Sequence, residues 1–472
     1  MFDPVIAPSG TLLGLLQRGR GDGTLHALTA PRAEALAALN HCVLSDPRHD
    51  WQVENRSLYY ARLYLDLHGE LGEIERHLFD PDDVLNTDES RTGLALAVLG
   101  HLASYGRRDA LELLRRYAAF GSSWAWALDE LALRDDDAGL RVLAAPILDR
   151  FPEDAEGDAE LAAAVRDAYE PRPWRLWADD PREVIGARVR AARERGSFDQ
   201  WQRQMRPSGP RPGWSVRAVF DWAQEGLERG AVLYVPAARC LTAVAGPGDR
   251  AEIVQAALTG HDGARSTALR YLADAHDPDV LDLIEAAVES PSHAVVDAAL
   301  DAFERMRTVA SLERARRWAP RPDALGAAAG RMLACRGGAQ DTELVLAALR
   351  EAVRGEGADA PTLWPLVDGA GRLGIACAAP VLRHVYRETA SSHLRGHAAK
   401  ALAATDPSFA AGFAVECLWD CEESTREVAA RHAETGDARV VDQLRRLAAD
   451  PAEEAEVQTA VRSRIGPDAT AL

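Results

Sequence analysis

The stretch HDPDVLDLIEAAVESPSHAVVDAALDAF, residues 276–303, decides the fold because it contains two apolar stripes separated by a chain break. The apolar residues of each stripe follow the three-to-four-residue spacing of one helix face. Pro291 stands between the stripes and cannot continue a helix, because it has no amide hydrogen to donate. The first stripe is Val280, Leu281, Ile284, Ala287 and Val288, and the second is Val295, Val296, Ala299, Leu300 and Phe303. The stretch therefore predicts a helical hairpin with an apolar face on each helix.

The same pattern returns 160 residues later in GDARVVDQLRRLAADPAEEAEVQTAV, which starts at Gly436. In both copies an Asp (Asp277, Asp437) precedes an apolar pair, and a Pro (Pro291, Pro451) stands at the same offset. Similar units begin near Asp249, Asp277, Ala310, Asp341, Ala376, Asp406 and Asp437. One hairpin cannot bury both of its apolar faces, whereas stacked neighbours form a continuous core. We therefore expect a linear array of hairpins.

The N-terminal third has the same character with less regular spacing. The first helices of its hairpins are expected near Glu70, Arg107 and Asp137, and their partners at 89–105, 122–133 and 157–169. Two further helices are expected before them, at 32–43 and 57–68. The array is therefore expected to open with an atypical cap.

Four of the second helices share a sequence pattern, in which a small or apolar residue and an Arg precede two variable positions and further small apolar residues. They are SRTGLALAVL (90–99), GARSTALRYL (263–272), HLRGHAAKAL (393–402) and STREVAARHA (424–433). Together with the recurring Asp, this pattern resembles the HEAT repeats of the short bacterial type. The resemblance implies an all-α fold, a right-handed α-α superhelix of HEAT- or ARM-like hairpins. It also implies that the shared arginines pair with acidic residues of neighbouring units; these are Arg91, Arg265, Arg395 and Arg426.

Composition limits the possible partners and compartments. The 54 basic residues stand against 73 acidic ones, a net charge of -19 that repels nucleic acid and anionic membranes and favours a partner with a basic segment. The six cysteines form no CxxC pair, as expected in a reducing compartment. No long uncharged apolar run is present, so we expect a soluble cytoplasmic protein without a membrane partner. Lys400 is the only lysine, an arginine bias typical of a bacterial, GC-rich genome.

The periodicity fails between the two arms of the array. We predict an N-terminal arm at 1–169, an irregular joint at 170–245 and a C-terminal arm at 246–472. From Arg172 to Arg217 the joint holds eleven arginines against five acidic residues. One hypothesis is a structural seam plugged by Trp. The other is a docking surface, since Trp and Arg are the side chains that anchor interfaces most often. Its candidate anchors are Trp174, Trp177, Trp201, Arg203, Arg206 and Trp214.

Catalytic and metal-binding patterns are few. The motifs GxSxG, GxxxxGK[ST], HExxH and GxGxxG do not occur, and no cofactor is expected. His393 and His397 are one helical turn apart, but a solvated His397 is the simpler interpretation, so no metal site is predicted. Trp124, Trp126 and Asp129 resemble the grouping with which HEAT-like alkylpurine DNA glycosylases surround a cationic base. Packing of these Trp side chains between hairpins is the structural alternative.

Two functions remain open, and the sequence does not decide whether the protein is an enzyme. The first is a non-catalytic HEAT-repeat scaffold or adaptor that binds a protein partner on the concave face made by second helices. The alternative is a HEAT-like DNA glycosylase that acts on bulky or cationic lesions with Trp124, Trp126 and Asp129. The glycosylase requires a positive concave face, because it must hold DNA. The adaptor has no such requirement.

Overall fold

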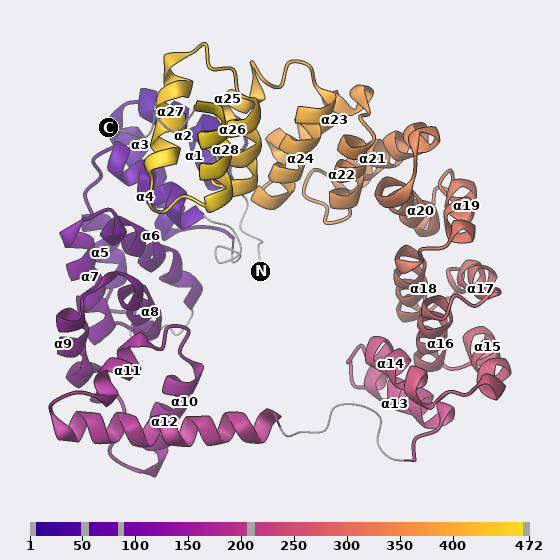
Figure 1. The fold of residues 1–472 in the computed structure, drawn as a ribbon, viewed down its shortest axis with the longest axis horizontal. Helices are drawn as coiled ribbons and strands as arrows, with labels where there is room; N and C mark the ends of the chain where they lie inside the picture. Colours follow the sequence, from indigo (N-terminus) through magenta and orange to yellow (C-terminus); the bar gives the residue numbers. More distant parts are fainter. Residues whose placement is uncertain (1–5, 49–55, 84–88, 205–212, 466–472) are drawn as a thin grey trace. The chain divides into compact units, whose positions relative to one another are not determined.

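The computed structural model describes residues 6–48, 56–83, 89–204 and 213–465. Over these ranges the chain forms helices and turns and no β-strand (Figure 1). The predicted all-α class is therefore confirmed. None of the helices in these ranges combines the length and the apolar character needed to cross a membrane.

The chain divides into two compact units whose limits differ from the predicted ones. The first unit holds residues 1–206, 387–399 and 408–472, and the second holds 207–386 and 400–407. The predicted joint at 170–245 is mostly helical and is shared between the units. Its helices are α11 (Arg172–Ala178), α12 (Glu183–Gln204), α13 (Val216–Glu228) and α14 (Tyr234–Val244).

The second unit is a run of helical hairpins. After α13 and α14 its elements are α15 (Arg250–Thr259), α16 (Asp262–Asp274), α17 (Val280–Ala287), α18 (His293–Arg305), α19 (Val309–Trp318), α20 (Ala324–Arg336), α21 (Thr342–Glu356), α22 (Leu363–Arg372), most of α23 (Ala379–Glu388) and the end of α24 (Ser392–Thr405). The two helices of a hairpin pack on each other from α13 with α14 through α21 with α22. The second helices also pack on one another in the order α14, α16, α18, α20 and α22. The predicted hairpin starts thus agree with the observed first helices.

The hairpin of residues 276–303 shows how these units form. Its helices α17 and α18 lie on either side of Pro291 and bury Val280, Ile284, Val295 and Phe303. Glu285 accepts hydrogen bonds from Arg314 at 3.0 Å, Trp318 at 3.1 Å and Arg321 at 3.1 Å. All three donors belong to the next hairpin or its loop. The acidic side of α17 therefore links successive hairpins.

The first unit combines the N-terminal helices with the end of the chain. Its N-terminal elements are α1 (Leu12–Gln17), α2 (Gly21–Thr29), α3 (Arg32–Leu44), α4 (Arg56–Asp66), α5 (Gly72–Leu78), α6 (Gly93–Ser104), α7 (Arg108–Phe120), α8 (Trp124–Arg134), α9 (Asp137–Leu148), α10 (Ala155–Asp167), α11 and α12. Its C-terminal elements are α25 (Phe413–Cys417), α26 (Glu423–His432), α27 (Ala438–Ala449) and α28 (Ala455–Ile465). In Figure 1 the indigo helices α1–α4 lie beside the yellow helices α25–α28, and α2 packs directly on α25.

One apolar core joins these two ends of the chain. Cys421, between α25 and α26, belongs to the same buried cluster as Leu16 of α1 and Tyr60 of α4. Cys417 is also fully buried, and its thiol packs as a small apolar side chain. No periodicity or motif in the sequence indicates that this C-terminal hairpin packs on the N-terminal cap.

Candidate functional site

Three second helices of the second unit, α20, α22 and α24, approach closely through glycine. A Cβ on Gly369 would lie 2.5 Å from Cβ of Ala334, and a Cβ on Gly371 would lie 2.8 Å from Cα of Ala401. Both contacts are too short for a side chain larger than hydrogen. Gly369 and Gly371 therefore set the spacing of these three helices.

A groove of about 700 Å³ lies over this contact. Its floor is made by small side chains, and longer side chains stand at its rim. The floor residues are Ala334, Gly369, Gly371, Ala401 and Ala404, and the rim residues are Cys335, Pro365, Asp368, Arg372 and Lys400. The groove therefore allows an extended chain to reach the helix backbones.

Positive charge dominates the rim of this groove. Arg372 donates a hydrogen bond of 2.8 Å to the carbonyl oxygen of Ala334, which holds its guanidinium at the C-terminal end of α20. Lys400 is exposed, and Asp368 is the acidic member of the rim. Next to Cys335, burial and repulsion from Arg307 lower the pKa of Arg336. Burial raises the pKa of Cys335, so its thiol is held in the neutral form.

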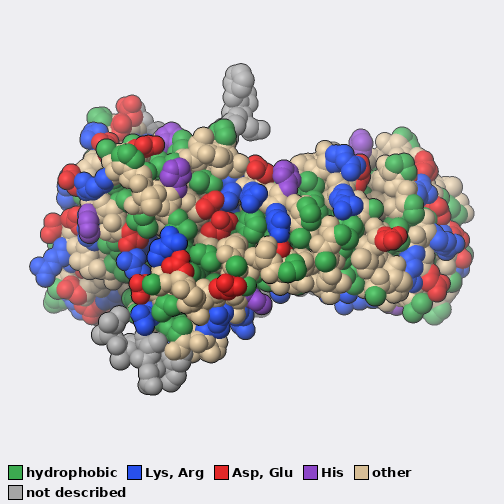
Figure 2. All heavy atoms as spheres, turned by 90° about the horizontal axis from the view of Figure 1, so that it is seen from above, with side chains coloured by type: hydrophobic (Ala, Val, Ile, Leu, Met, Phe, Trp, Pro, Cys, Tyr) green, Lys and Arg blue, Asp and Glu red, His purple; other side chains and the backbone are tan. Residues whose placement is uncertain are grey.

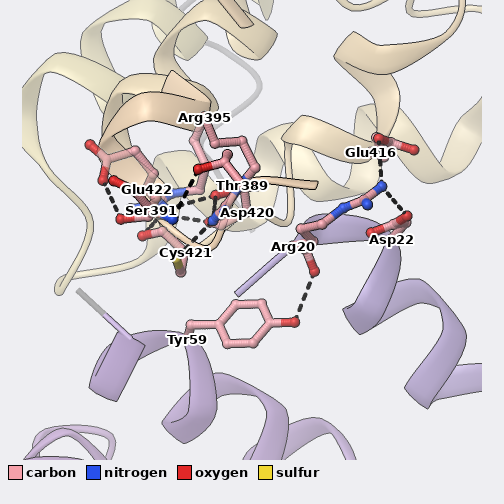
Figure 3. Close-up of polar contacts among 12 residues, drawn as sticks. Arg20, Asp22, Tyr59, Thr389, Ser391, Arg395, Glu416, Asp420, Cys421 and Glu422 are labelled. Carbon is pink, nitrogen blue, oxygen red and sulfur yellow. Dashed lines mark hydrogen bonds and ion pairs between the residues drawn. The ribbon is translucent and has the colours of Figure 1, made fainter. Parts of the chain in front are cut away.

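A second polar arrangement, in the first unit, closes the N-terminal segment onto the C-terminal hairpins (Figure 3). The N–H of Cys421 donates a 2.9 Å hydrogen bond to the carbonyl oxygen of Gly19. Arg20 donates to the carbonyl oxygen of Arg387 at 2.9 Å, and Tyr59 donates to the carbonyl oxygen of Arg20, also at 2.9 Å. We call this set of contacts the clasp.

Two carboxylates of the clasp share one arginine. Arg20 lies 2.5 Å from Asp22 and 3.7 Å from Glu416, as Figure 3 shows. Burial raises the pKa of Glu416 to about 7; the Asp22 carboxylate raises it further and Arg20 lowers it. Burial likewise raises the pKa of Asp22, against the effect of Arg20. The clasp therefore binds protons more readily than exposed carboxylates would.

Two of the four arginines of the repeat pattern pair with an acidic residue of the next hairpin, as the resemblance implied. Arg395 and Asp420 are both fully buried and lie 2.8 Å apart. Arg426 pairs with Glu453 at 2.6 Å. Arg91 instead pairs at 2.7 Å with Asp83 of its own hairpin, and Arg265 donates to the hydroxyl of Ser290 at 3.0 Å. These arginines are structural, because their donors are used inside the protein.

Of the predicted anchors of the Arg/Trp joint, the structure describes the side chains of Trp174, Trp177 and Trp214. Trp174 is 3 % exposed and Trp177 is 0 % exposed, and Trp177 donates to the carbonyl oxygen of Leu140 at 2.8 Å. Both rings pack in the core of the first unit, so neither faces a partner. Trp214 is half-buried against Trp222, with the ring centres 5.2 Å apart. The side chains of Trp201, Arg203 and Arg206 lie outside the described residues.

Two residues of the glycosylase alternative, Trp124 and Asp129, lie on different faces of α8 (Trp124–Arg134). Trp124 packs edge-on against Phe151 and Trp174, with ring centres 5.8 and 6.4 Å apart. Trp126, two residues along α8, is half-buried against the apolar core. Asp129 accepts the N–H of Glu170 at 3.0 Å, and burial raises its pKa to about 6. Five residues separate Trp124 from Asp129, about 140° around a helix, so the ring and the carboxylate do not share one face.

Neither the groove nor the clasp was predicted from the sequence. A single lysine in a second helix, Lys400, is a signal from which part of the groove could have been found. Nothing in the sequence linked Arg20 to Glu416, because no periodicity relates them. Within the described residues no group of three potential metal ligands occurs.

Comparison with known proteins gives no relatives. No family model, no curated protein and no solved structure matches the chain.

Proposed function

We propose that the protein is a non-catalytic adaptor, a HEAT-like right-handed α-α superhelix that binds a segment of a protein partner on its second helices. Two features support the resemblance to HEAT repeats. The second helices of the second unit pack on one another in sequence order. The pattern arginines Arg395 and Arg426 bind acidic residues that follow in the next repeats. The absence of a CxxC pair among the six cysteines accords with a cytoplasmic, reducing setting.

The groove over α20, α22 and α24 is the observation that carries the proposal. It lies on second helices, where an adaptor of this class is expected to bind. Its floor is small and apolar, and Arg372 and Lys400 at its rim exceed the single charge of Asp368. A partner segment that enters this groove is therefore acidic. The net charge of -19 favoured a basic segment, but the local charges of a groove govern the contacts made within it.

The two rim cations would contribute in different ways. Arg372 is held by the carbonyl oxygen of Ala334, so little side-chain entropy is lost when it binds a carboxylate. Lys400 is an exposed and flexible point charge, which orders on binding. A charge-assisted hydrogen bond contributes roughly 1.5–3 kcal/mol when water is excluded. Two such bonds and a backbone in contact with the floor suffice for a selective but reversible complex.

Affinity capture with three variants tests this function. The intact chain and each variant are used to capture partners from the native host's lysate, and the captured proteins are identified by mass spectrometry. Lys400→Glu reverses a rim charge, and Ala404→Trp fills the groove without changing charge. Arg354→Glu makes the same charge change as Lys400→Glu, but on the exposed face of α21.

The expected result is a protein captured by the intact chain and by Arg354→Glu, and lost with Lys400→Glu and Ala404→Trp. Equal loss with Arg354→Glu would show that only the overall charge matters. Capture of the same protein by the intact chain and by all three variants would mean that the partner binds outside the groove. Either result would contradict the proposed site.

A further inference from the structure

A cavity of about 350 Å³ lies in the first unit, apart from the groove of the proposed function. It is bounded on one side by α4 and on the other by α27, with Tyr105 and the loop of Leu418–Asp420 completing the wall. The N-terminal and C-terminal parts of the chain thus each supply one wall. The volume is within the range of small-molecule sites, about 300–1,000 Å³.

The interior of the cavity is apolar and aromatic. Leu63, Leu418 and Leu447 are buried side chains at its wall. Tyr59 lies beside them, fixed by its hydrogen bond to the carbonyl oxygen of Arg20, and Trp419 is half-buried. These side chains suit an apolar or aromatic group of a ligand, which would gain about 25 cal/mol for each Å² of surface removed from water.

Three ion pairs of unequal strength, two of them made by Arg62, connect the walls. Arg62 of α4 lies 2.7 Å from Asp450 and 3.0 Å from Glu453. The Tyr105 hydroxyl donates to Asp450 at 2.8 Å, so this first set is closely bonded. The third pair, Asp66 with Arg446, is longer.

Asp66 and Arg446 lie 3.3 Å apart, and their side chains are 28 % and 66 % exposed. Within the described part of the chain Arg446 makes no other ion pair. A long, exposed pair of this kind contributes at most about 1 kcal/mol. A ligand can therefore separate it at little cost and bind both charges.

We infer that this cavity binds an apolar or aromatic α-amino acid as its zwitterion. The ligand ammonium binds the carboxylate of Asp66, and the ligand carboxylate binds the guanidinium of Arg446. The side chain enters the space between Tyr59, Trp419 and Leu447. No covalent step takes place, because the site supplies two charges and an apolar compartment.

The opposite charges of Asp66 and Arg446 at the mouth of the cavity favour a zwitterion over a ligand with a single charge. A simple anion would bind Arg446 and be repelled by Asp66. A simple cation would bind Asp66 and be repelled by Arg446. The other charges of the lining are already paired, Arg62 with Asp450 at 2.7 Å and Asp420 with Arg395 at 2.8 Å, so they do not alter the balance. A zwitterion satisfies Asp66 and Arg446 at once.

Binding would also strengthen the contact between the chain ends. The ligand joins α4 to α27, and any molecule that binds the folded state alone stabilises it. The midpoint of thermal unfolding of the full chain should therefore rise with the concentration of the amino acid.

Isothermal titration calorimetry of the full-length protein with L-phenylalanine tests the inference. Glycine lacks the apolar group, N-acetyl-L-phenylalanine lacks the ammonium, and L-phenylalaninamide lacks the carboxylate. We expect L-phenylalanine to bind and each of these three ligands to bind at least tenfold more weakly. These comparisons need no change in the protein, so loss of folding cannot explain them.

Variants locate the site. Asp66→Asn and Arg446→Gln are expected to weaken L-phenylalanine binding at least tenfold, and Ala449→Trp, which fills the mouth while keeping both charges, should abolish it. Arg445→Gln is the matched control, because Arg445 is the neighbouring arginine and pairs with Asp442 instead. The inference is overturned if L-phenylalanine gives neither heat nor a shift in the unfolding midpoint. Equal affinity for the capped analogues, or equal loss in Arg445→Gln, would also overturn it.

Discussion

The carbonyl oxygen of Gly19 accepts a 2.9 Å hydrogen bond from the N–H of Cys421. The two residues stand near opposite ends of the chain and belong to one compact unit. Around them Arg18 and Arg20 donate to the carbonyl oxygens of Glu388 and Arg387. The N-terminal segment is therefore part of the packing of the C-terminal hairpins, and changes at the clasp should affect both.

Gly21→Ala should destabilise the clasp. Gly21 is the first residue of α2, and a Cβ there would lie 1.8 Å from the carbonyl oxygen of Glu416, which is backbone and cannot turn aside. Overpacking of this kind costs about 1–3 kcal/mol. Gly72→Ala is the matched control, because Gly72 also begins a helix but has open space where the methyl would stand. Chemical denaturation compares the free energies of unfolding; an equal effect in both variants would contradict the close contact.

Arg395→Met should be strongly destabilising. The substitution leaves the carboxylate of Asp420 buried without its partner, and both side chains are fully buried. Breaking such a pair costs about 3–5 kcal/mol. Arg229→Met removes an exposed pair with Glu225 and should cost less than about 1 kcal/mol. A loss below 1 kcal/mol in Arg395→Met, measured by denaturant unfolding, would show that the buried pair contributes little.

The free energy of unfolding of the first unit should fall as the pH rises from about 4.5 to 7, because Glu416 of the clasp ionises over this range. Burial raises the pKa of Glu416 from 4.5 to about 7, so the folded state holds a proton that the unfolded chain releases. Stability from this group is complete below about pH 4.5 and is lost as pH approaches 7. Glu416 faces Asp22, Arg20, Arg387 and Asp420, whose charges contribute to its pKa.

Glu416→Gln tests this dependence. The Gln side chain cannot ionise. The free energy of unfolding of the variant should therefore fall less between about pH 4.5 and 7 than that of the unaltered protein. Part of the decrease will remain, because burial also raises the pKa of Glu130 to about 7. Glu456→Gln, an exposed change on α28, should leave the pH profile as it was. Identical profiles for all three proteins would contradict the raised pKa of Glu416.

The hairpins were predictable because each rests on local information. The spacing from Val280 to Phe303 and the break at Pro291 specify two helices without reference to the rest of the chain. The clasp could not be predicted in this way, because Gly19 and Cys421 share no periodicity or motif. The groove could not be predicted either, because it depends on how closely Gly369 lets α22 pack on α20. The sequence of one repeat does not specify how it packs on the next.

The Arg/Trp joint shows that amino-acid composition does not predict which side chains are exposed. Its tryptophans and positive charge suggested a docking surface, but composition does not determine whether a side chain faces solvent or the core. Trp174 and Trp177 are three residues apart on α11, so both rings lie on one side of the helix and enter the core. Their ring centres are 5.0 Å apart.

Trp124→Ala should lower stability through loss of core packing. The ring contacts Phe151 and Trp174, and Arg150 stacks over it at 5.7 Å. Because the side chain is only partly buried, we expect a loss of about 2–4 kcal/mol. Phe120→Ala removes an exposed ring of the same unit and should cost less than about 0.5 kcal/mol. Unchanged stability in Trp124→Ala would contradict the packing role and revive the hypothesis of a ligand pocket on α8.

Cross-linking from Lys400 tests the adaptor account most directly. A photoactivatable imidoester can be attached at this position, because the chain has no other lysine side chain, and the amidine that it forms keeps the positive charge of Lys400. Peptide mapping separates this adduct from the one on the terminal α-amine. After capture of the partner and illumination, mass spectrometry identifies the partner peptide joined to Lys400. The account predicts one acidic segment, whose synthetic peptide competes with the intact partner. Basic peptides, or a partner captured without any bond to Lys400, would contradict the groove as the binding site.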